Sequence, residues 1–440
     1  MKKKIKVLHV SMSFEVLSAG YRLHKAILHE GGVNSYCIVK KSPLNDIHIT
    51  KLSNRMLSKL KIKILLRIKK LTMNAFYRNR LNLPFSSGDI SFGDIIRQIN
   101  VINPDIVHFH WICGDLIKIE DIWRIKSPIV WSLHDQWGYT GGCHVVAEKT
   151  PQLSGEWLPY CDYDVDKMCN KYTESCGNCG VLRSRREKDL SFRILQRKKK
   201  AFAKVKSMTI IGVSQWMADC AKKSIVFADK KVVCLSNPID TDIFKPLDKM
   251  QARMLWNLPN HKKLVLFGAI SATSVLYKGY DLVIDALRKL ATENVEFIVF
   301  GSNEPVNAPR LPYKARYLGH LTDTVSLVSL YNACDVMVHP SMREAFGLTV
   351  AESLSCGTPV VAFGHGGLLD IVDHKINGYL AQPFNTGDFA KGIDWVLNNE
   401  NYDELCKNAR EKVVKNFDNS VIVKKMRNLY EEVILGSSLN

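Results

Sequence analysis

Short apolar runs alternate with helical stretches from the start of the chain. Ile5 to Val10 has the composition of a first buried strand, a helical stretch follows at Leu23 to Leu28, and the β-rich segments SYCIVKK, DIVHFHW and PIVWSLHD come next. Buried strands that alternate with helices are typical of a parallel sheet covered on both faces. The first third of the chain therefore predicts a doubly wound α/β domain.

The same rhythm begins again at residue 262. The strand-like segments KKLVLFGAI, VEFIVFG, ARYLGH, DVMVHPS and TPVVAFG are accompanied by predicted helices at Tyr280 to Leu290 and Val325 to Cys334. Before them, SNPIDTDIFKP at 236–246 contains two prolines and an Asx-rich turn, which stop regular structure. We therefore predict an N-terminal domain over 1–237, a C-terminal domain over 238–415 and a cleft between them. A last helical segment over 416–440 is expected to cross back to the N-terminal domain.

Two insertions interrupt the rhythm of the N-terminal domain. Residues 51–82 carry ten Lys and Arg and no acidic residue. Their apolar residues recur at spacings of three and four, which predicts a basic amphipathic helix; these residues are Leu52, Met56, Leu60, Ile64, Ile68 and Leu71. The second insertion, 143–179, contains five cysteines.

The positive charge of the chain lies in its first half. The net charge is +18, and residues 1–237 hold 40 Lys and Arg against 20 Asp and Glu, while residues 238–440 hold 21 against 23. A basic half suits a nucleic acid, an anionic membrane or a phosphorylated substrate. No stretch approaches the roughly 18 uninterrupted apolar residues of a membrane-spanning helix, and MKKKIKVLHVSMSF is not followed by a signal-peptide cleavage site. We therefore expect a cytoplasmic protein.

Candidate ligand-binding residues cluster in the second domain. Ligands of doubly wound domains bind at the carboxyl ends of the strands, where helix N-termini present free N–H groups to anions. Lys278 directly precedes a predicted helix there and offers a cation to a diphosphate. Glu344 and Glu352 stand eight residues apart, and two carboxylates on one face can hold separate hydroxyl groups of one ligand. Taken singly, the lysine and the glutamate pair are each better explained as part of a solvated surface.

Five segments, taken in order, resemble glycosyltransferase family 4, whose members are retaining GT-B enzymes. They are GVSQWMADCAKKS at 212–224, NPIDTDIF at 237–244, KGYDLVIDAL at 278–287, NACDVMVHPS at 332–341 and HPSMREAFGLTVAESLSCGTPVVAFGHGG at 339–367. The resemblance implies a GT-B fold, with two doubly wound Rossmann-like domains facing a central cleft and a nucleotide-sugar donor on the C-terminal domain.

The same resemblance implies roles for individual residues. Glu344 would contact the donor sugar near its reacting carbon, Lys278 would neutralise the leaving diphosphate, and Glu352 would bind the ribose. The other implied donor-binding positions are the backbone of Phe346, Gly347, Leu348 and Thr349, the strand end near Leu321, and the loop of Gly366 and Gly367. No divalent metal or other cofactor is implied for catalysis, because Lys278 and helix N-termini offset the charge of the leaving group.

Two positions depart from the pattern of the family. The family usually places an Arg shortly after the first strand of the second domain, whereas this chain has Gly268-Ala269-Ile270-Ser271-Ala272-Thr273. Near the N-terminus, Ser18-Ala19-Gly20 takes the place of a glycine pair, so that Gly20 is the position carried over. His134, at the end of SLH, corresponds to a family histidine near the donor sugar.

The implied activity is retaining transfer of a hexose-type sugar to a lipid-linked or oligosaccharide acceptor in bacterial surface polysaccharide synthesis, such as exopolysaccharide assembly. The basic helix predicts peripheral attachment to the anionic inner face of the plasma membrane. A GT-B sugar-nucleotide epimerase is the alternative enzyme, which would release products from the donor alone. A nucleic-acid-binding protein is disfavoured because it leaves Glu344, Glu352 and Lys278 without a role.

The cysteine-rich insertion has two interpretations. Cys143, Cys161, Cys176 and Cys179, with Cys169 or His144 in reserve, include a CxxC pair that would close a tetrahedral structural zinc site. Reduced cysteines in a small core explain the same pattern. Structural disulfides are not expected in a reducing compartment.

Overall fold

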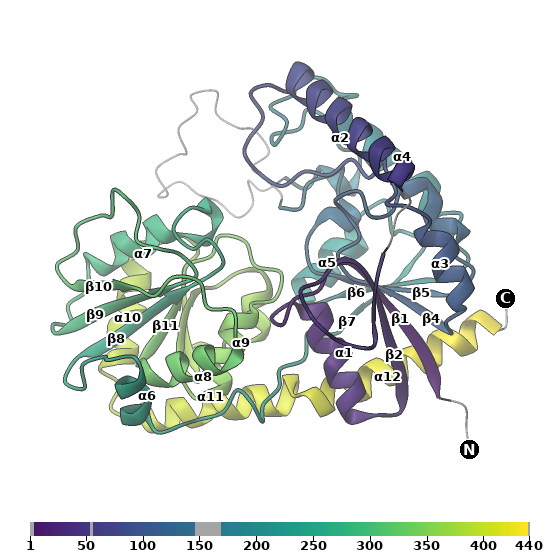
Figure 1. The fold of residues 1–440 in the computed structure, drawn as a ribbon. Helices are drawn as coiled ribbons and strands as arrows, with labels where there is room; N and C mark the ends of the chain where they lie inside the picture. Colours follow the sequence, from purple (N-terminus) through teal and green to yellow (C-terminus); the bar gives the residue numbers. More distant parts are fainter. Residues whose placement is uncertain (1–3, 53–55, 146–168, 439–440) are drawn as a thin grey trace. The chain divides into compact units, whose positions relative to one another are not determined.

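The computed structural model describes residues 4–52, 56–145 and 169–438. The chain divides into two compact units, each built on its own parallel sheet (Figure 1). The first unit contains the described residues up to Leu235 and those from Val423 onward, and the second contains Ser236–Ile422.

The sheet of the first unit has seven parallel strands among the described residues, in the spatial order β3-β2-β1-β4-β5-β6-β7. Their bounds are β1 (Ile5–Ser13), β2 (Val33–Lys41), β3 (Ile49–Lys51), β4 (Ile106–Phe109), β5 (Ile129–Leu133), β6 (Met208–Gly212) and β7 (Lys231–Cys234). The strand order reverses between β1 and β4, and such a switch point is where open α/β sheets bind their ligands.

The helices of the first unit cover this sheet and include the predicted basic helix. They are α1 (Ala19–Glu30), α2 (Met56–Phe76), α3 (Ile95–Ile102), α4 (Leu190–Phe202) and α5 (Gln215–Lys223), with short 3₁₀ turns at Ile119–Arg124, Trp137–Tyr139 and Lys171–Thr173. The side chains of Asp189 and Ser214 accept backbone N–H groups at the starts of α4 and α5 and so fix where these helices begin.

The second unit has a six-stranded parallel sheet, in the order β10-β9-β8-β11-β12-β13. Its strands are β8 (Lys263–Gly268), β9 (Val295–Phe300), β10 (Lys314–Tyr317), β11 (Val336–His339), β12 (Val360–Phe363) and β13 (Gly378–Ala381). Its helices are α6 (Lys249–Leu255), α7 (Tyr280–Leu287), α8 (Thr324–Ala333), α9 (Leu348–Ser355), α10 (Thr386–Leu397) and α11 (Tyr402–Phe417), with 3₁₀ turns at Leu276–Lys278 and Gly366–Asp370.

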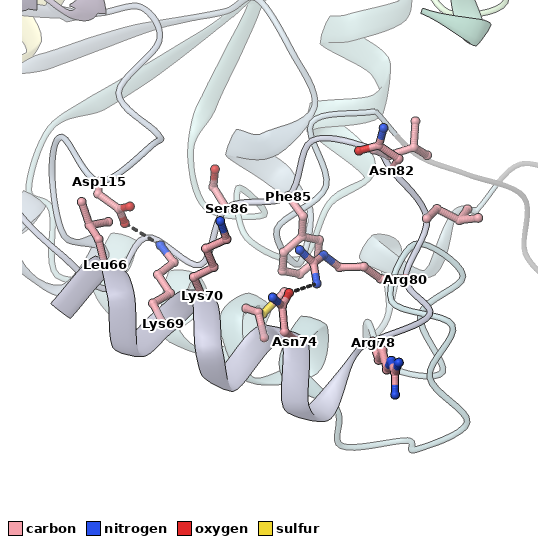
Figure 2. A pocket seen from close by; sticks show the side chains of 13 residues that line it. Leu66, Lys69, Lys70, Asn74, Arg78, Arg80, Asn82, Phe85, Ser86 and Asp115 are labelled. Carbon is pink, nitrogen blue, oxygen red and sulfur yellow. Dashed lines mark hydrogen bonds and ion pairs between the residues drawn. The ribbon is translucent and has the colours of Figure 1, made fainter. Parts of the chain in front are cut away.

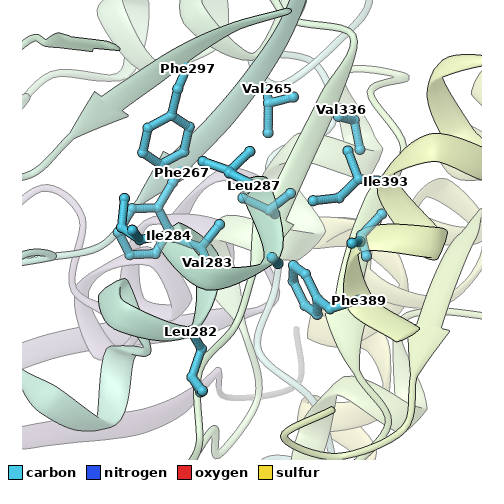
Figure 3. Packing of buried hydrophobic residues seen from close by; sticks show 14 of the residues in the cluster. Val265, Phe267, Leu282, Val283, Ile284, Leu287, Phe297, Val336, Phe389 and Ile393 are labelled. Carbon is cyan, nitrogen blue, oxygen red and sulfur yellow. The ribbon is translucent and has the colours of Figure 1, made fainter. Parts of the chain in front are cut away.

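The core of the second unit shows why its strands are almost wholly apolar. Alternate residues such as Val265, Phe267 and Phe297 pack against α7 and α10, as Figure 3 shows for Val283 and Phe389. The strand residues between them are buried as well, because helices also cover the opposite face of the sheet. Burial of both faces is what continuous apolar runs indicate.

The last helix, α12 (Asn419–Ser438), belongs to both units. It begins after Asp418, whose extended backbone separates it from α11, rather than at residue 416. Its residues from Val423 onward are part of the first unit, where Tyr430 is fully buried. In the described part of the chain, no helix has the length and apolar character needed to cross a membrane.

Candidate functional site

Two loops at the carboxyl ends of β8 and β11 are held together by close backbone contact. Gly279 follows Lys278 with a φ of +77°, and a Cβ at this position would lie 2.1 Å from the carbonyl oxygen of Pro340. The backbone N–H of Met342 donates to the carbonyl of Tyr277 over 2.7 Å. Glycine is therefore required at 279, since it alone permits both the positive φ and the close approach. This contact brings Lys278 onto the loop that carries Glu344.

Glu344 accepts hydrogen bonds from two sides. Lys278 Nζ lies 3.2 Å and His339 Nε2 lies 3.1 Å from Glu344 Oε2. Burial alone would raise the pKa of the Glu344 carboxyl, but the charge of Lys278 and the hydrogen bond from His339 hold it well below its usual range. The site therefore contains an ionised carboxylate and a lysine that form an ion pair.

The loop after β12 packs against the backbone of Glu344. Gly366 has a φ of +62°, and a Cβ there would lie 2.8 Å from the carbonyl oxygen of Glu344. Gly367 approaches the carbonyl of Ala345 in the same way, and its N–H donates to the carbonyl of Glu344 over 3.0 Å. His365 Nε2 bonds the carbonyl of Ser341 at 2.9 Å. The two loops thus fix each other through glycines that leave no room for side chains.

The N-terminus of α9 follows directly after Glu344. Gly347 occupies its N-cap with a φ of 107°, and Leu348 and Thr349 form the first turn. Phe346 is buried and packs edge-on against Phe417. The first N–H groups of a helix lack intrahelical partners and attract anions. A phosphate could therefore be held here, beside the cation of Lys278.

Glu352 and Leu321 lie apart from this cluster in their contacts. Glu352 is 1% exposed on α9, and Tyr331 of α8 donates a hydrogen bond of 2.7 Å to Glu352 Oε2. Leu321 is half-buried in the loop between β10 and α8. The structure thus brings Lys278, Glu344, Gly347, Gly366 and Gly367 together, whereas the carboxylate of Glu352 is turned into the packing between two helices.

In the first unit, His134 ends a chain of hydrogen-bonded imidazoles. His134 Nε2 lies 3.0 Å from His110 Nδ1, and His110 Nε2 lies 2.8 Å from His9 Nδ1. Gly20, at the start of α1, allows this arrangement, because a Cβ there would lie 2.8 Å from the ring of His110. His108 lies beside them and bonds Tyr430 Oη at 2.6 Å and Ser132 Oγ at 2.8 Å.

Burial keeps these imidazoles neutral. It lowers the pKa of His134 to about 4 and that of His108 to about 3, and burial together with the neighbouring imidazoles holds the pKa values of His9 and His110 well below their ordinary value. In a chain of neutral rings, each can donate through one nitrogen only. The tautomer of His134 is therefore linked to those of His110 and His9.

Nitrogen atoms of His9, His108 and His110 lie within 4.8 Å of one another, which is close enough to consider a metal ion. Both ring nitrogens of His108 already have hydrogen-bond partners, and His9 Nδ1 is bonded to His110. Only His9 Nε2 is buried without a partner among the described atoms of these three rings. The observed arrangement is therefore a hydrogen-bonded network.

The cysteine-rich insertion is described in part, and Cys161 lies outside the described residues. The thiols of Cys143 and Cys179 are in contact, and this contact, together with burial, raises the pKa of Cys143. Cys176 and Cys169 lie near enough to raise it further. His144 is engaged elsewhere, with its ring bonded to Asp135 Oδ2 at 2.7 Å and to Ser86 Oγ at 2.8 Å.

Sequence reasoning assigned no role to His339, His9, His108 or Tyr430. His339 stands in the quoted segment HPSMREAFG, five residues before Glu344, but that spacing alone does not indicate a contact. The contact of Tyr430 with His108 joins residues 322 positions apart and has no local signal. The available clue was that histidines recur at 9, 108, 110 and 134, within or directly after predicted strands.

Comparison with known proteins identifies a family model that matches the second unit and relatives that match part of the chain. Residues 256–415 match the model of a family described as glycosyl transferases group 1. The chain is 30% identical over 206 residues to an uncharacterized glycosyltransferase of Methanocaldococcus jannaschii, a match covering 44% of this chain and 52% of that protein. It is 34% identical over 185 residues to a D-inositol 3-phosphate glycosyltransferase of Mycolicibacterium smegmatis, covering 39% and 42% respectively. The chain thus spans about half the length of these curated relatives.

The fold is shared over nearly the whole chain with solved structures. The crystal structure of HepE of Anabaena in complex with UDP-glucose superposes on this chain with a TM-score of 0.63 at 15% identity. The superposition covers 97% of this chain and 100% of HepE. The predicted GT-B class, with two Rossmann-like domains on parallel sheets, is confirmed.

Proposed function

Because residues 256–415 belong to the glycosyl transferases group 1 family, we propose that this protein is a retaining glycosyltransferase. It transfers a hexose-type sugar from a nucleotide-sugar donor to a lipid-linked or oligosaccharide acceptor in bacterial surface polysaccharide synthesis. The second unit binds the donor, and the first unit binds the acceptor.

The observation that carries this proposal is the ion pair of Lys278 and Glu344 beside the N-terminus of α9. A sugar nucleotide carries a diphosphate and several hydroxyl groups. Lys278 and the free N–H groups of α9 suit the diphosphate, and their charge stabilises it as it leaves. The ionised carboxylate of Glu344 suits a sugar hydroxyl, because a carboxylate accepts strong hydrogen bonds. No catalytic metal is proposed, since these groups already offset the negative charge.

The direct test is a panel of nucleotide sugars that begins with UDP-glucose, because a protein of the same fold binds it. One donor should be hydrolysed slowly alone and consumed faster when an acceptor is added. Nuclear magnetic resonance of the product should show the anomeric configuration of the donor. Release of an epimerised free sugar in place of a transferred one would instead identify a sugar-nucleotide epimerase.

The surface of α2 supports an acceptor at an anionic membrane. Ile64, Ile68 and Leu71 form an outward stripe and are 51%, 51% and 62% exposed. Lys63 and Arg67 are exposed beside it. A helix with an apolar stripe flanked only by basic residues lies in the membrane interface, where it buries the stripe and places its cations at anionic head groups. We propose that α2 attaches the first unit to the cytoplasmic face of the plasma membrane in this way.

The cysteine insertion is proposed to hold one structural zinc. The contact between Cys143 and Cys179, with Cys176 and Cys169 nearby, supports a set of four thiolates in which Cys169 takes the place first given to Cys161. A closed site of this kind needs four ligands and supplies folding energy rather than catalysis. Elemental analysis of protein purified without added metal should find about one zinc per chain. A metal-free, fully folded preparation would favour the reduced-cysteine alternative.

A further inference from the structure

A pocket of about 510 Å³ lies in the first unit, between α2 and the segment 78–86 (Figure 2). The residues of α2 that line it recur at helical spacing on the face turned away from the exposed apolar stripe: Leu66, Lys69, Lys70, Met73 and Asn74. The helix therefore has two distinct faces, one outward and apolar, the other turned toward the body of the unit.

The pocket is rich in positive charge. It is lined by Lys69, Lys70, Arg78 and Arg80 but by a single carboxylate, that of Asp115. Lys69 Nζ is paired with Asp115 Oδ1 at 2.6 Å and with Asp89 Oδ1, which lies outside the pocket lining, at 3.2 Å, so its charge is fully compensated. Lys70 has no hydrogen-bond or ion-pair partner among the residues that the structure describes, and Figure 2 shows it extending toward Ser86. The remaining excess of cations suits an anion with several acceptor oxygens.

The amide and apolar residues beside these cations indicate which class of anion fits the pocket. Arg80 Nη1 donates to Asn74 Oδ1 over 3.1 Å, so this hydrogen bond fixes one edge of its guanidinium and does not use its other N–H donors. Leu83 and Phe85 add apolar surface next to these polar groups. Arginine and lysine with amide neighbours are typical of phosphate recognition. The adjoining apolar residues favour a phosphate that carries an apolar chain.

The pocket is joined to the loop of His134 by a continuous set of hydrogen bonds. Ser86, on the wall of the pocket, bonds His144 Nε2, and His144 Nδ1 bonds Asp135, the residue after His134. Trp137 Nε1 donates to the carbonyl of Ser86 over 2.8 Å. A ligand held in the pocket is therefore linked to the segment that follows β5 through Ser86 and His144.

We propose that this pocket binds the phosphate or diphosphate that joins the lipid of the acceptor to its saccharide. The assignment to the acceptor rests on the proposed function, whereas the recognition of a phosphoester rests on the pocket alone. The same chemistry is present in phospholipid head groups, so the experiment has one arm for each source.

The first arm measures binding of inorganic pyrophosphate by calorimetry to the full chain carrying Lys278→Ala, which removes the donor-site cation. Pyrophosphate should bind, and adding Lys70→Gln with Arg80→Gln should weaken binding at least about tenfold, because two charge-assisted contacts are lost. Lys199→Gln with Lys200→Gln, two exposed lysines of α4, is the matched control and should change binding less than about twofold. Lys70→Gln alone, at an exposed position, provides the same test if the double variant unfolds. Absent binding, or equal loss in the control, overturns the pocket as a phosphate site.

The second arm assigns the source in the chain with Lys278 intact. If the acceptor supplies the phosphate, Lys70→Gln raises KM for a lipid diphosphate saccharide and leaves donor hydrolysis unchanged. If Lys70→Gln instead weakens only co-sedimentation with phosphatidylglycerol vesicles, the acceptor assignment is overturned. Pyrophosphate binding without any sugar transfer by the unaltered chain would refute the proposed function but not the phosphate site.

Discussion

Lys278 and Glu344 form the closest pair of opposite charges at the candidate donor site, with 3.2 Å between Nζ and Oε2. We predict that Glu344→Gln and Lys278→Ala each lower the rate of sugar transfer at least about tenfold, equivalent to roughly 1.4 kcal/mol of transition-state stabilisation. The reason is that each removes a charge that the departing diphosphate or the sugar would contact. Initial rates at saturating donor are the measurement. Lys391→Ala, at an exposed lysine of α10, is the control and should retain full activity. Near-normal rates in either folded site variant would contradict the assignment.

Gly279 provides a second residue-level prediction, because its backbone sets where Lys278 lies. Gly279→Ala would place a methyl group 2.1 Å from the carbonyl of Pro340 at a φ of +77°. We expect a loss of about 1–3 kcal/mol in the free energy of unfolding, from strain, together with reduced transfer. Urea denaturation measures the first effect. Gly387→Ala is the matched control, since that glycine lies inside α10 with only a contact of 3.4 Å. Equal stability of both variants would show that the loop adapts without cost.

Site residues that stand in a recognisable sequence motif could be predicted from the sequence. Contacts between residues that come together only through tertiary packing could not. Lys278, Glu344 and the two glycines at 366 and 367 stand in recognisable segments, and the structure brings them together. The burial of Glu352 against Tyr331 depends on how α8 packs on α9, which the spacing of two glutamates does not specify. The spacing of Glu344 and Glu352 describes their positions along one segment of chain, whereas the contact of Glu352 with Tyr331 depends on the packing of two helices.

At the scale of elements, α2 gives the clearest prediction. Vesicles that contain anionic lipid should co-sediment the protein, and added salt should weaken the binding, because each basic residue near the surface contributes on the order of 1 kcal/mol. Lys63→Glu with Arg67→Glu should reduce the binding strongly. Lys199→Glu with Lys200→Glu on α4 makes the same change in net charge at another exposed site and should have little effect. Equal binding to neutral vesicles would contradict attachment through α2.

Most central strands were predictable as elements and the edge strands less so, although the segment ARYLGH predicted the edge strand β10. β1, β4, β5, β8, β9, β11 and β12 are mostly apolar because both of their faces are buried. β6 is buried as well but was not among the predicted strands. β3 has three residues and β7 is partly exposed, so neither has an apolar run to detect. The predicted basic helix appears as α2, yet its sequence pattern did not reveal that Lys69 and Lys70 line a pocket.

At the scale of the whole molecule, the buried histidines make stability depend on pH. Burial lowers the pKa of His24 to about 4, despite the nearby carboxylate of Asp46, and that of His108 to about 3. In the unfolded chain both rings titrate near about 6.5, so below that pH the unfolded state binds more protons than the folded state. The stabilisation is therefore complete above about pH 6.5 and is lost as the pH falls toward the folded pKa values, on the order of 3 kcal/mol for each ring.

Urea midpoints at pH 7.5, 5.5 and 4.5 should then decrease in a range that lies above the midpoints of the carboxylates, which are about pH 4 in the unfolded chain. His29→Gln, which removes an exposed ring of α1, should leave the dependence unchanged. Ring proton resonances offer an independent readout, with the midpoint for His134 expected near pH 4. Flat urea midpoints between pH 7.5 and 4.5 would contradict the neutral-histidine network.

The two parts of the first unit are synthesised at separate times. Its seven strands are complete once Leu235 has been added, but the residues from Val423 onward are made only after the whole of the second unit. Domains generally fold in the order of their synthesis. Here the nascent first unit holds His108 without the hydroxyl of Tyr430 until α12 emerges. The core of the first unit is therefore closed by a helix that is synthesised after the second unit, and a stalled chain that ends within α11 would leave this core exposed.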